Sequence, residues 1–135
     1  MMALFTVDPL IFLTITLMAI TMNILWYAPF AFGSFWLQTQ QNLPHSPPSN
    51  AKGALLLFFT QACTLFVINA LKNGLGIHTF GEGALLGLAC GLGLVGSCTL
   101  NNAFFFSIPL KLWAIDLIHQ LWVISLAAGT LAVLH

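Results

Sequence analysis

Four long apolar runs dominate this 135-residue chain and constrain its fold. They extend over residues 9–32, 53–72, 83–106 and 109–134. Each reaches or nearly reaches the ~20 residues that a helix needs to cross about 30 Å of hydrocarbon. Because lipid cannot satisfy backbone N–H and C=O groups, and because the runs lack the alternation of strands, they are expected to be helices. The sequence therefore predicts an all-α integral membrane four-helix bundle, a single transmembrane domain over residues 1–135 with two antiparallel hairpins.

The balance of side chains agrees with a lipid environment. Hydrophobic residues make up 59% of the chain and charged residues 4%, with a formal net charge of zero. A soluble domain has roughly 25% charged residues, so this chain has too few to coat a water-exposed surface. Without a basic or acidic patch, nucleic acid is excluded as a partner, and the lipid bilayer is the expected one.

No motif for a cofactor, a metal or catalysis is found in the sequence. The glycine-rich stretch GLGLVG at residues 91–96 lies inside an apolar run and lacks the strand and the acidic residue of a nucleotide site. The three cysteines, Cys63, Cys90 and Cys98, also lie inside apolar runs and are interpreted as packing residues. We therefore expect no cofactor and no metal, and enzyme chemistry has little support.

The connections between the runs set the expected topology. Residues 38–52 form a polar loop, whereas Ser107 to Pro109 leave only a tight turn between the last two helices. Four crossings place Lys52 and Lys111 on one side of the membrane, and Lys72 on the other with both termini. The positive-inside rule then puts the termini outside the cytoplasm.

A group of polar side chains is expected inside the last hairpin. Asp116 lies about 10 Å along its helix from the turn, and an ionised Asp at a helix centre costs about 2.5 to 3.5 kcal/mol. It should therefore face protein or water rather than lipid. The predicted solute-binding, proton-binding or interhelical polar cluster comprises Asn101, Asn102, Asp116, His119, Gln120 and Gln61, and Asn23 is positioned to join it. The sequence leaves open whether the cluster binds a solute or a proton or only holds helices together by hydrogen bonds.

Two further patterns concern packing rather than chemistry. Gly83, Gly87 and Gly91 recur at every fourth position, which predicts a helix-packing face that lets a neighbouring backbone approach closely. Aromatic residues concentrate near the expected helix ends. The sequence predicts that these rings form an interfacial belt, with Trp26, Tyr27, Trp36 and Trp113 as its members.

Two stretches, WYAPFAFGSFW (26–36) and NNAFFFSIPLKLWAID (101–116), resemble the signature regions of the bacterial membrane family called domain of unknown function 1761. The resemblance implies four transmembrane helices and the bacterial inner membrane as the expected location, and it implies no particular activity. The chain departs from the family pattern at Asp116, where Asn is usual, and at Leu117 and Ile118, where Gly and an aromatic are usual. Because Asn cannot ionise, the comparison favours a hydrogen-bonding role for position 116. The matching positions are Trp26, Tyr27, Pro29, Phe32, Gly33, Trp36, Asn101, Pro109, Leu110, Leu112, Trp113 and Ile115.

Two function classes are favoured by these features, and a membrane-embedded enzyme is a third that they favour less. The first is a small transport or permeation unit in which the polar cluster contacts a solute or a proton. The second is an accessory or structural subunit of a larger membrane complex. The glycine pattern adds the expectation of a homo-oligomer or of a partner membrane subunit.

Overall fold

A computed structural model describes residues 2–26 and 50–134, and these residues are helical apart from short connections. Tyr27, Trp36, the end of the first apolar run and most of the loop predicted at 38–52 lie outside the described residues. The helices are η1 (Met2–Phe5), α1 (Pro9–Trp26), α3 (Asn50–Leu75), α4 (Phe80–Cys90), the π-helical segment η2 (Gly91–Gly96), α5 (Ser97–Phe105) and α6 (Leu110–Leu134).

The all-α prediction is confirmed, and four helical spans are long and apolar enough to cross a membrane. They are Pro9–Trp26, Ala51–Leu75, Phe80–Phe105 and Leu110–Leu134. The third span joins α4, η2 and α5 without a break. Many large apolar side chains on these spans are exposed, including Leu85 and Phe104. Such a surface is suited to hydrocarbon rather than to water.

Local sequence signals explain where the helices begin and end. Asp8 Oδ1 accepts hydrogen bonds from the backbone N–H groups of Leu10 and Ile11, which caps α1. Thr79 caps α4 by accepting a hydrogen bond from the backbone N–H of Glu82 at 3.3 Å. These caps satisfy N–H groups that a helix leaves unpaired at its first turn.

The second span is longer than the sequence predicted. It begins at Asn50, inside the range assigned to the polar loop, because after the prolines at 47 and 48 no residue opposes a helix. It ends where Gly76 takes a φ of 65°, and the N–H of Ile77 then bonds to the carbonyl of Lys72 at 3.1 Å. This is the glycine-dependent end of a helix described by Schellman geometry.

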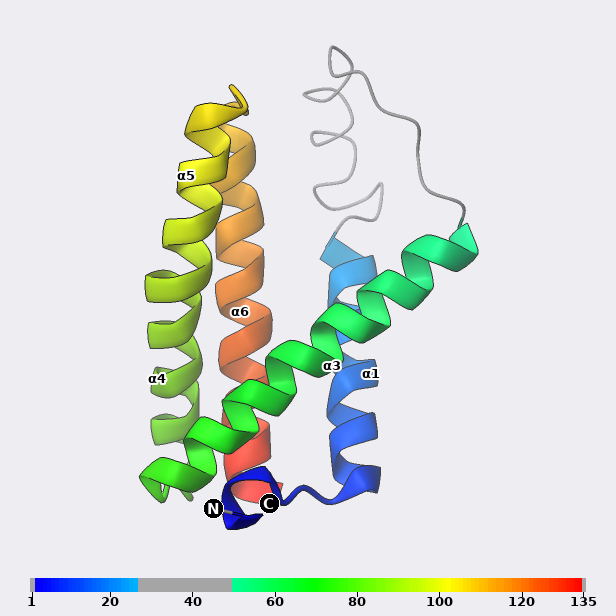
Figure 1. Cartoon of the computed structure of the whole chain (residues 1–135), viewed down its shortest axis with the longest axis vertical. Helices are drawn as coiled ribbons and strands as arrows, with labels where there is room; N and C mark the ends of the chain where they lie inside the picture. Colours follow the sequence, from blue (N-terminus) through cyan, green and yellow to red (C-terminus); the bar gives the residue numbers. More distant parts are fainter. Residues whose placement is uncertain (1, 27–49, 135) are drawn as a thin grey trace.

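The spans pack as a bundle that is tightest near the chain termini (Figure 1). The unit α4–η2–α5 and α6 form an antiparallel hairpin, α1 lies on the other flank of α6, and α3 crosses them obliquely. The two ends of the chain lie at the same end of the bundle. Buried side chains of α1, α3 and α6 form the core, namely Ile15, Ala19, Leu65, Ile68, Val123, Ile124, Ala127, Ala128 and Leu131.

The glycines spaced by four bring α4 and α6 into close contact. A Cβ atom added to Gly83 would lie 2.6 Å from the carbonyl oxygen of Ala128, and one added to Gly87 would lie 2.7 Å from that of Ile124. Both distances are too short for a side chain, so these positions require glycine. The glycine face is therefore occupied by α6 of the same chain.

Candidate functional site

A cavity of about 360 Å³ lies between α5 and α6 and contains part of the predicted polar cluster. Asn102 of α5 and Asp116 and Gln120 of α6 line it. Apolar side chains make up most of the remaining wall, so an acid and two amides share a small space inside a membrane span. The full lining is Val95, Thr99, Asn102, Ala103, Ile108, Trp113, Asp116, Leu117 and Gln120.

The turn between α5 and α6 fixes the geometry of this cavity. Ser107 takes a left-handed conformation with a φ of 53°, and the N–H of Ile108 returns to the carbonyl of Ala103 at 2.9 Å. The chain therefore reverses within a few residues and sets the two helices side by side. Trp113 Nε1 donates a hydrogen bond to Thr99 Oγ1 at 3.0 Å, which ties α6 to α5 across the cavity wall. Trp113, predicted to belong to an interfacial belt, thus has a specific partner within the hairpin.

His119 takes part in a second polar contact, between α6 and α1. Its side chain is fully buried, and its Nε2 lies 2.5 Å from Oδ1 of Asn23. The side-chain amide of Asn23 donates to the carbonyl of Ala19 at 2.9 Å, so Oδ1 is the acceptor and His119 Nε2 carries the proton. Trp26 stacks on the imidazole, with ring centroids 5.2 Å apart. Trp26, like Trp113, has a defined partner in the bundle.

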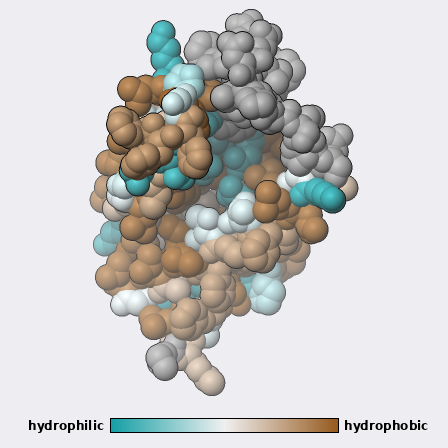
Figure 2. All heavy atoms as spheres, turned by 45° about the horizontal axis from the view of Figure 1, so that its top comes forward, coloured by the Kyte–Doolittle hydropathy of each residue, from teal (hydrophilic) through white to brown (hydrophobic). Residues whose placement is uncertain are grey.

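Further polar side chains are buried inside the bundle. Gln61, from the middle of α3, is only 7% exposed, and Thr16 and Asn69 are fully buried. Seen obliquely from the end at which α5 turns into α6, hydrophilic residues gather in a recess between hydrophobic flanks (Figure 2). In the same region α3 diverges from α6, whereas near the termini the helices converge (Figure 1). Asn69 lies at the opposite end, where its side-chain amide donates a hydrogen bond to the carbonyl of Thr6, so buried polar groups occur at both ends of the bundle.

Asn101 is directed away from the cavity that contains Asn102. It lines a separate surface hollow with Ser97, Cys98 and Phe104. The sequence predicted that Asn101 and Asn102 belong to one polar cluster. The π-helical segment Gly91–Gly96 changes the phase of α5 relative to α4, because its hydrogen bonds span five residues instead of four.

The structure thus distributes the predicted cluster over several places. Asn102, Asp116 and Gln120 share one cavity, His119 bonds to Asn23 on α1, Gln61 is buried on α3, and Asn101 faces a separate hollow. Sequence reasoning did not identify Thr99 and Trp113 as part of the cavity. Their pairing depends on the exact turn geometry, which the sequence does not encode in a recognisable motif.

Among residues 2–26 and 50–134 no group of three or more His, Cys, Asp or Glu side chains is arranged to hold a metal ion. Cys63 and Cys90 line one apolar hollow between α3 and α4, and Cys98 is exposed on α5. The three thiols are free in this part of the chain.

Four apolar helical spans around a partly polar interior fit a multi-pass membrane protein. The chain belongs to the family described as "Protein of unknown function (DUF1761)", whose profile matches residues 10–132. The match covers almost the whole chain and confirms the resemblance seen in the two signature stretches. No curated protein and no solved structure matches the chain significantly.

Proposed function

We propose that this protein is a small permeation unit that binds a polar solute in the α5–α6 cavity. The observation that carries the proposal is the convergence of Asn102, Asp116 and Gln120 on one cavity inside a membrane-spanning hairpin. Carboxyl and amide groups cost free energy in hydrocarbon, and they are retained there when they pair with one another or line a solute pathway.

The chemistry of the lining indicates the class of solute. Asp116 supplies two carboxyl oxygens, and Asn102 and Gln120 each supply an amide oxygen and an NH2 group, so the cavity offers several hydrogen-bond acceptors together with donors. A small planar solute with several N–H donors suits such a lining. A volume of about 360 Å³ accommodates a molecule of a few heavy atoms together with water.

The shape of the bundle supports access from one side only. The hydrophilic recess opens at the end where α5 turns into α6 (Figure 2). Toward the termini, the interior contains the apolar core residues Ile15, Ala19, Leu65 and Leu131, with Asn69 and Lys72 buried beside them. His119 and Asn23 lie at the junction of α1 and α6 and hold these helices together. A solute thus enters from the Lys111 end, and passage to the other side requires the core contacts to separate.

Uptake of radiolabelled guanidinium and urea into vesicles containing the purified protein tests this proposal. The two probes have nearly the same shape and differ in charge. Wild-type protein should admit at least one of them several-fold faster than protein-free vesicles do. Vesicles with the Asp116→Leu variant should take up both probes no faster than protein-free vesicles, because the substitution removes both the charge and the hydrogen-bonding capacity of the side chain.

Asp116→Asn separates binding from charge. It retains hydrogen bonding and should preserve the uptake of urea while reducing that of guanidinium. If neither probe enters faster than in protein-free vesicles while the wild-type protein is folded, the permeation proposal fails. If Asp116→Leu then lowers only the melting temperature, the carboxyl serves the packing of the hairpin, as in a structural subunit.

A further inference from the structure

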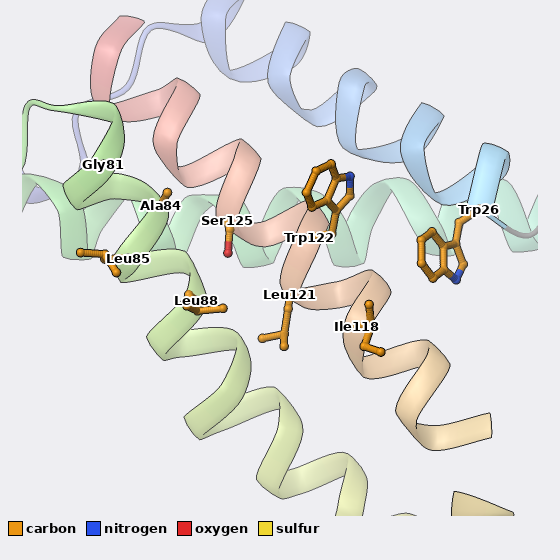
Figure 3. Close-up of a pocket in the computed structure, with 9 residues that line it drawn as sticks. All are labelled: Trp26, Gly81, Ala84, Leu85, Leu88, Ile118, Leu121, Trp122 and Ser125. Atoms are coloured by element: carbon orange, nitrogen blue, oxygen red, sulfur yellow. The ribbon is translucent and has the colours of Figure 1, made fainter. Parts of the chain in front are cut away.

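A long apolar groove on the surface of the hairpin lies outside the polar cavity. It has a volume of about 750 Å³ and is bounded by α4, α6 and the end of α1 (Figure 3). In the close-up, Leu88 and Leu121 lie across from each other between α4 and α6, and the two indoles lie on the side of α6 that faces α1. The lining residues are Trp26, Gly81, Ala84, Leu85, Leu88, Ile118, Leu121, Trp122 and Ser125.

The spacing of the lining residues shows that the groove follows the helix axes. On each helix they recur at intervals of three and four residues, as one face of a helix does. The close contacts of Gly83 with Gly129 and of Gly91 with Leu121 fix the antiparallel register of the two helices. In this register Gly81 of α4 lies opposite position 131 of α6, which is about 13 residues along α6 from Ile118. The groove is therefore about 20 Å long, more than half of the ~30 Å hydrocarbon thickness.

The lining is nearly all hydrocarbon. Apart from the Ser125 hydroxyl and the indole N–H groups, its nine side chains are aliphatic or aromatic carbon or, at Gly81, hydrogen. On α4, the small residues Gly81 and Ala84 leave the space open. On α6, the large side chain of Trp122, which is 58% exposed, bounds the groove. A slender apolar molecule aligned with the helices would bury this surface along its whole length.

We propose that the groove binds one hydrocarbon chain of a membrane lipid. The spans that surround it are long and apolar enough to cross a membrane, where lipid chains are the molecules present at high concentration. A lipid chain is slender and apolar, as the groove is, and needs no polar partner. One end of the bound lipid chain would contact Trp26, which lines the groove. The indole of Trp26 stacks on His119, which forms the α1–α6 hydrogen bond with Asn23. The bound lipid would therefore help to hold Trp26 against this hydrogen-bonded pair.

Photo-labelling tests the proposal with the full chain in phosphatidylglycerol vesicles that contain a lipid with a diazirine on one acyl chain. Labelled positions are mapped by mass spectrometry after illumination. Leu85, Leu88 and Trp122 should carry several-fold more label than Leu13 and Leu55, apolar side chains of α1 and α3 that are exposed but line none of the described pockets.

Two substitutions of the same kind provide the control. Ala84→Trp fills the groove and should reduce the labelling of Leu88 and Trp122 to the level of the other apolar residues. Ala89→Trp adds the same side chain to an exposed position of α4 outside the groove and should change nothing. If each residue is labelled only in proportion to the exposure of its side chain, the groove binds no lipid chain.

Protection of Leu85 and Leu88 from the label would also overturn the proposal. It would mean that protein covers the groove, either a second copy of the chain or residues 27–49. Crosslinking between copies would identify the first case, and crosslinks within one chain would identify the second.

Discussion

The Nε2 atom of His119 lies 2.5 Å from Oδ1 of Asn23, and this hydrogen bond joins the middle of α6 to the last turn of α1. Both side chains are buried, at 0% and 6% exposure, in the interior of a membrane bundle. Within hydrocarbon such a bond has no competing water, so it fixes which faces of the two helices meet. The His119–Asn23 pair therefore holds α1 against α6 at this side of the bundle interior.

Replacing Asn23 with Leu should destabilise the bundle, because the buried Nε2–H of His119 loses its acceptor. The expected cost is about 1 to 3 kcal/mol of unfolding free energy. Thr21→Leu, at an exposed position of the same helix, should have little effect. Unfolding in mild detergent, followed by circular dichroism, gives both values. Equal stabilities for the two variants would contradict a structural role for the Asn23–His119 bond.

Gly87→Ala should destabilise the α4–α6 contact, since the added Cβ would lie 2.7 Å from the carbonyl oxygen of Ile124. Overpacking of this kind costs about 1 to 3 kcal/mol. Gly93→Ala is the matched control, because no atom lies within 4 Å of its added Cβ. Its melting temperature should stay at or above that of the wild type. The packing account fails if Gly87→Ala is as stable as Gly93→Ala.

Ser107→Gly should stabilise the protein, because residue 107 has a left-handed backbone with a φ of 53°. That conformation costs an L-residue about 1 to 2 kcal/mol, and part of the gain is offset by the greater freedom of glycine in the unfolded chain. We expect a net gain of about 0.5 to 1 kcal/mol. Ser97→Gly, in a right-handed helical position with a φ of −64°, should instead lower the melting temperature. The same direction of change in both variants would refute the explanation.

The sequence was sufficient to predict the helical spans because hydrocarbon allows few alternatives for an apolar run. It also indicated close packing at Gly83, Gly87 and Gly91, although it did not reveal that α6 is the neighbour. The arrangement of the polar residues was harder to predict. Asp116 and His119 are three residues apart on α6, so their directions differ by about 60°, which is enough in a bundle to meet different neighbours.

The position of α5 was also beyond sequence reasoning. Glycine tolerates many backbone conformations, so GLGLVG was consistent with a regular helix, and the π-helical hydrogen bonds emerge only from the packing of the whole hairpin. Asn101 and Asn102 line different hollows, as neighbouring residues about 100° apart on a helix do.

Orientation in the membrane stays a prediction. Lys52 and Lys111 lie at one end of the four-span bundle, and Lys72 lies near the end that carries the termini. By the positive-inside rule, the end with two lysines faces the cytoplasm. A C-terminal alkaline phosphatase fusion should therefore be active and a C-terminal green fluorescent protein fusion dark in bacteria. The reverse pattern would invert the orientation without altering the fold.

The central claim is that water and polar solutes reach the α5–α6 cavity, and the chemical accessibility of position 120 tests it most directly. In a background with Cys63, Cys90 and Cys98 changed to Ala, a cysteine replaces either Gln120, which lines the cavity, or Ile118, which is 58% exposed on an apolar face of the same helix. Both positions are at nearly the same depth in the membrane.

A charged, membrane-impermeant methanethiosulfonate reagent is added to vesicles with the Lys111 side outward. Because a thiol reacts as thiolate and needs water, we predict that Gln120→Cys reacts at least tenfold faster than Ile118→Cys. Equal, slow reaction at both positions would show that the cavity is dry and would contradict the permeation account.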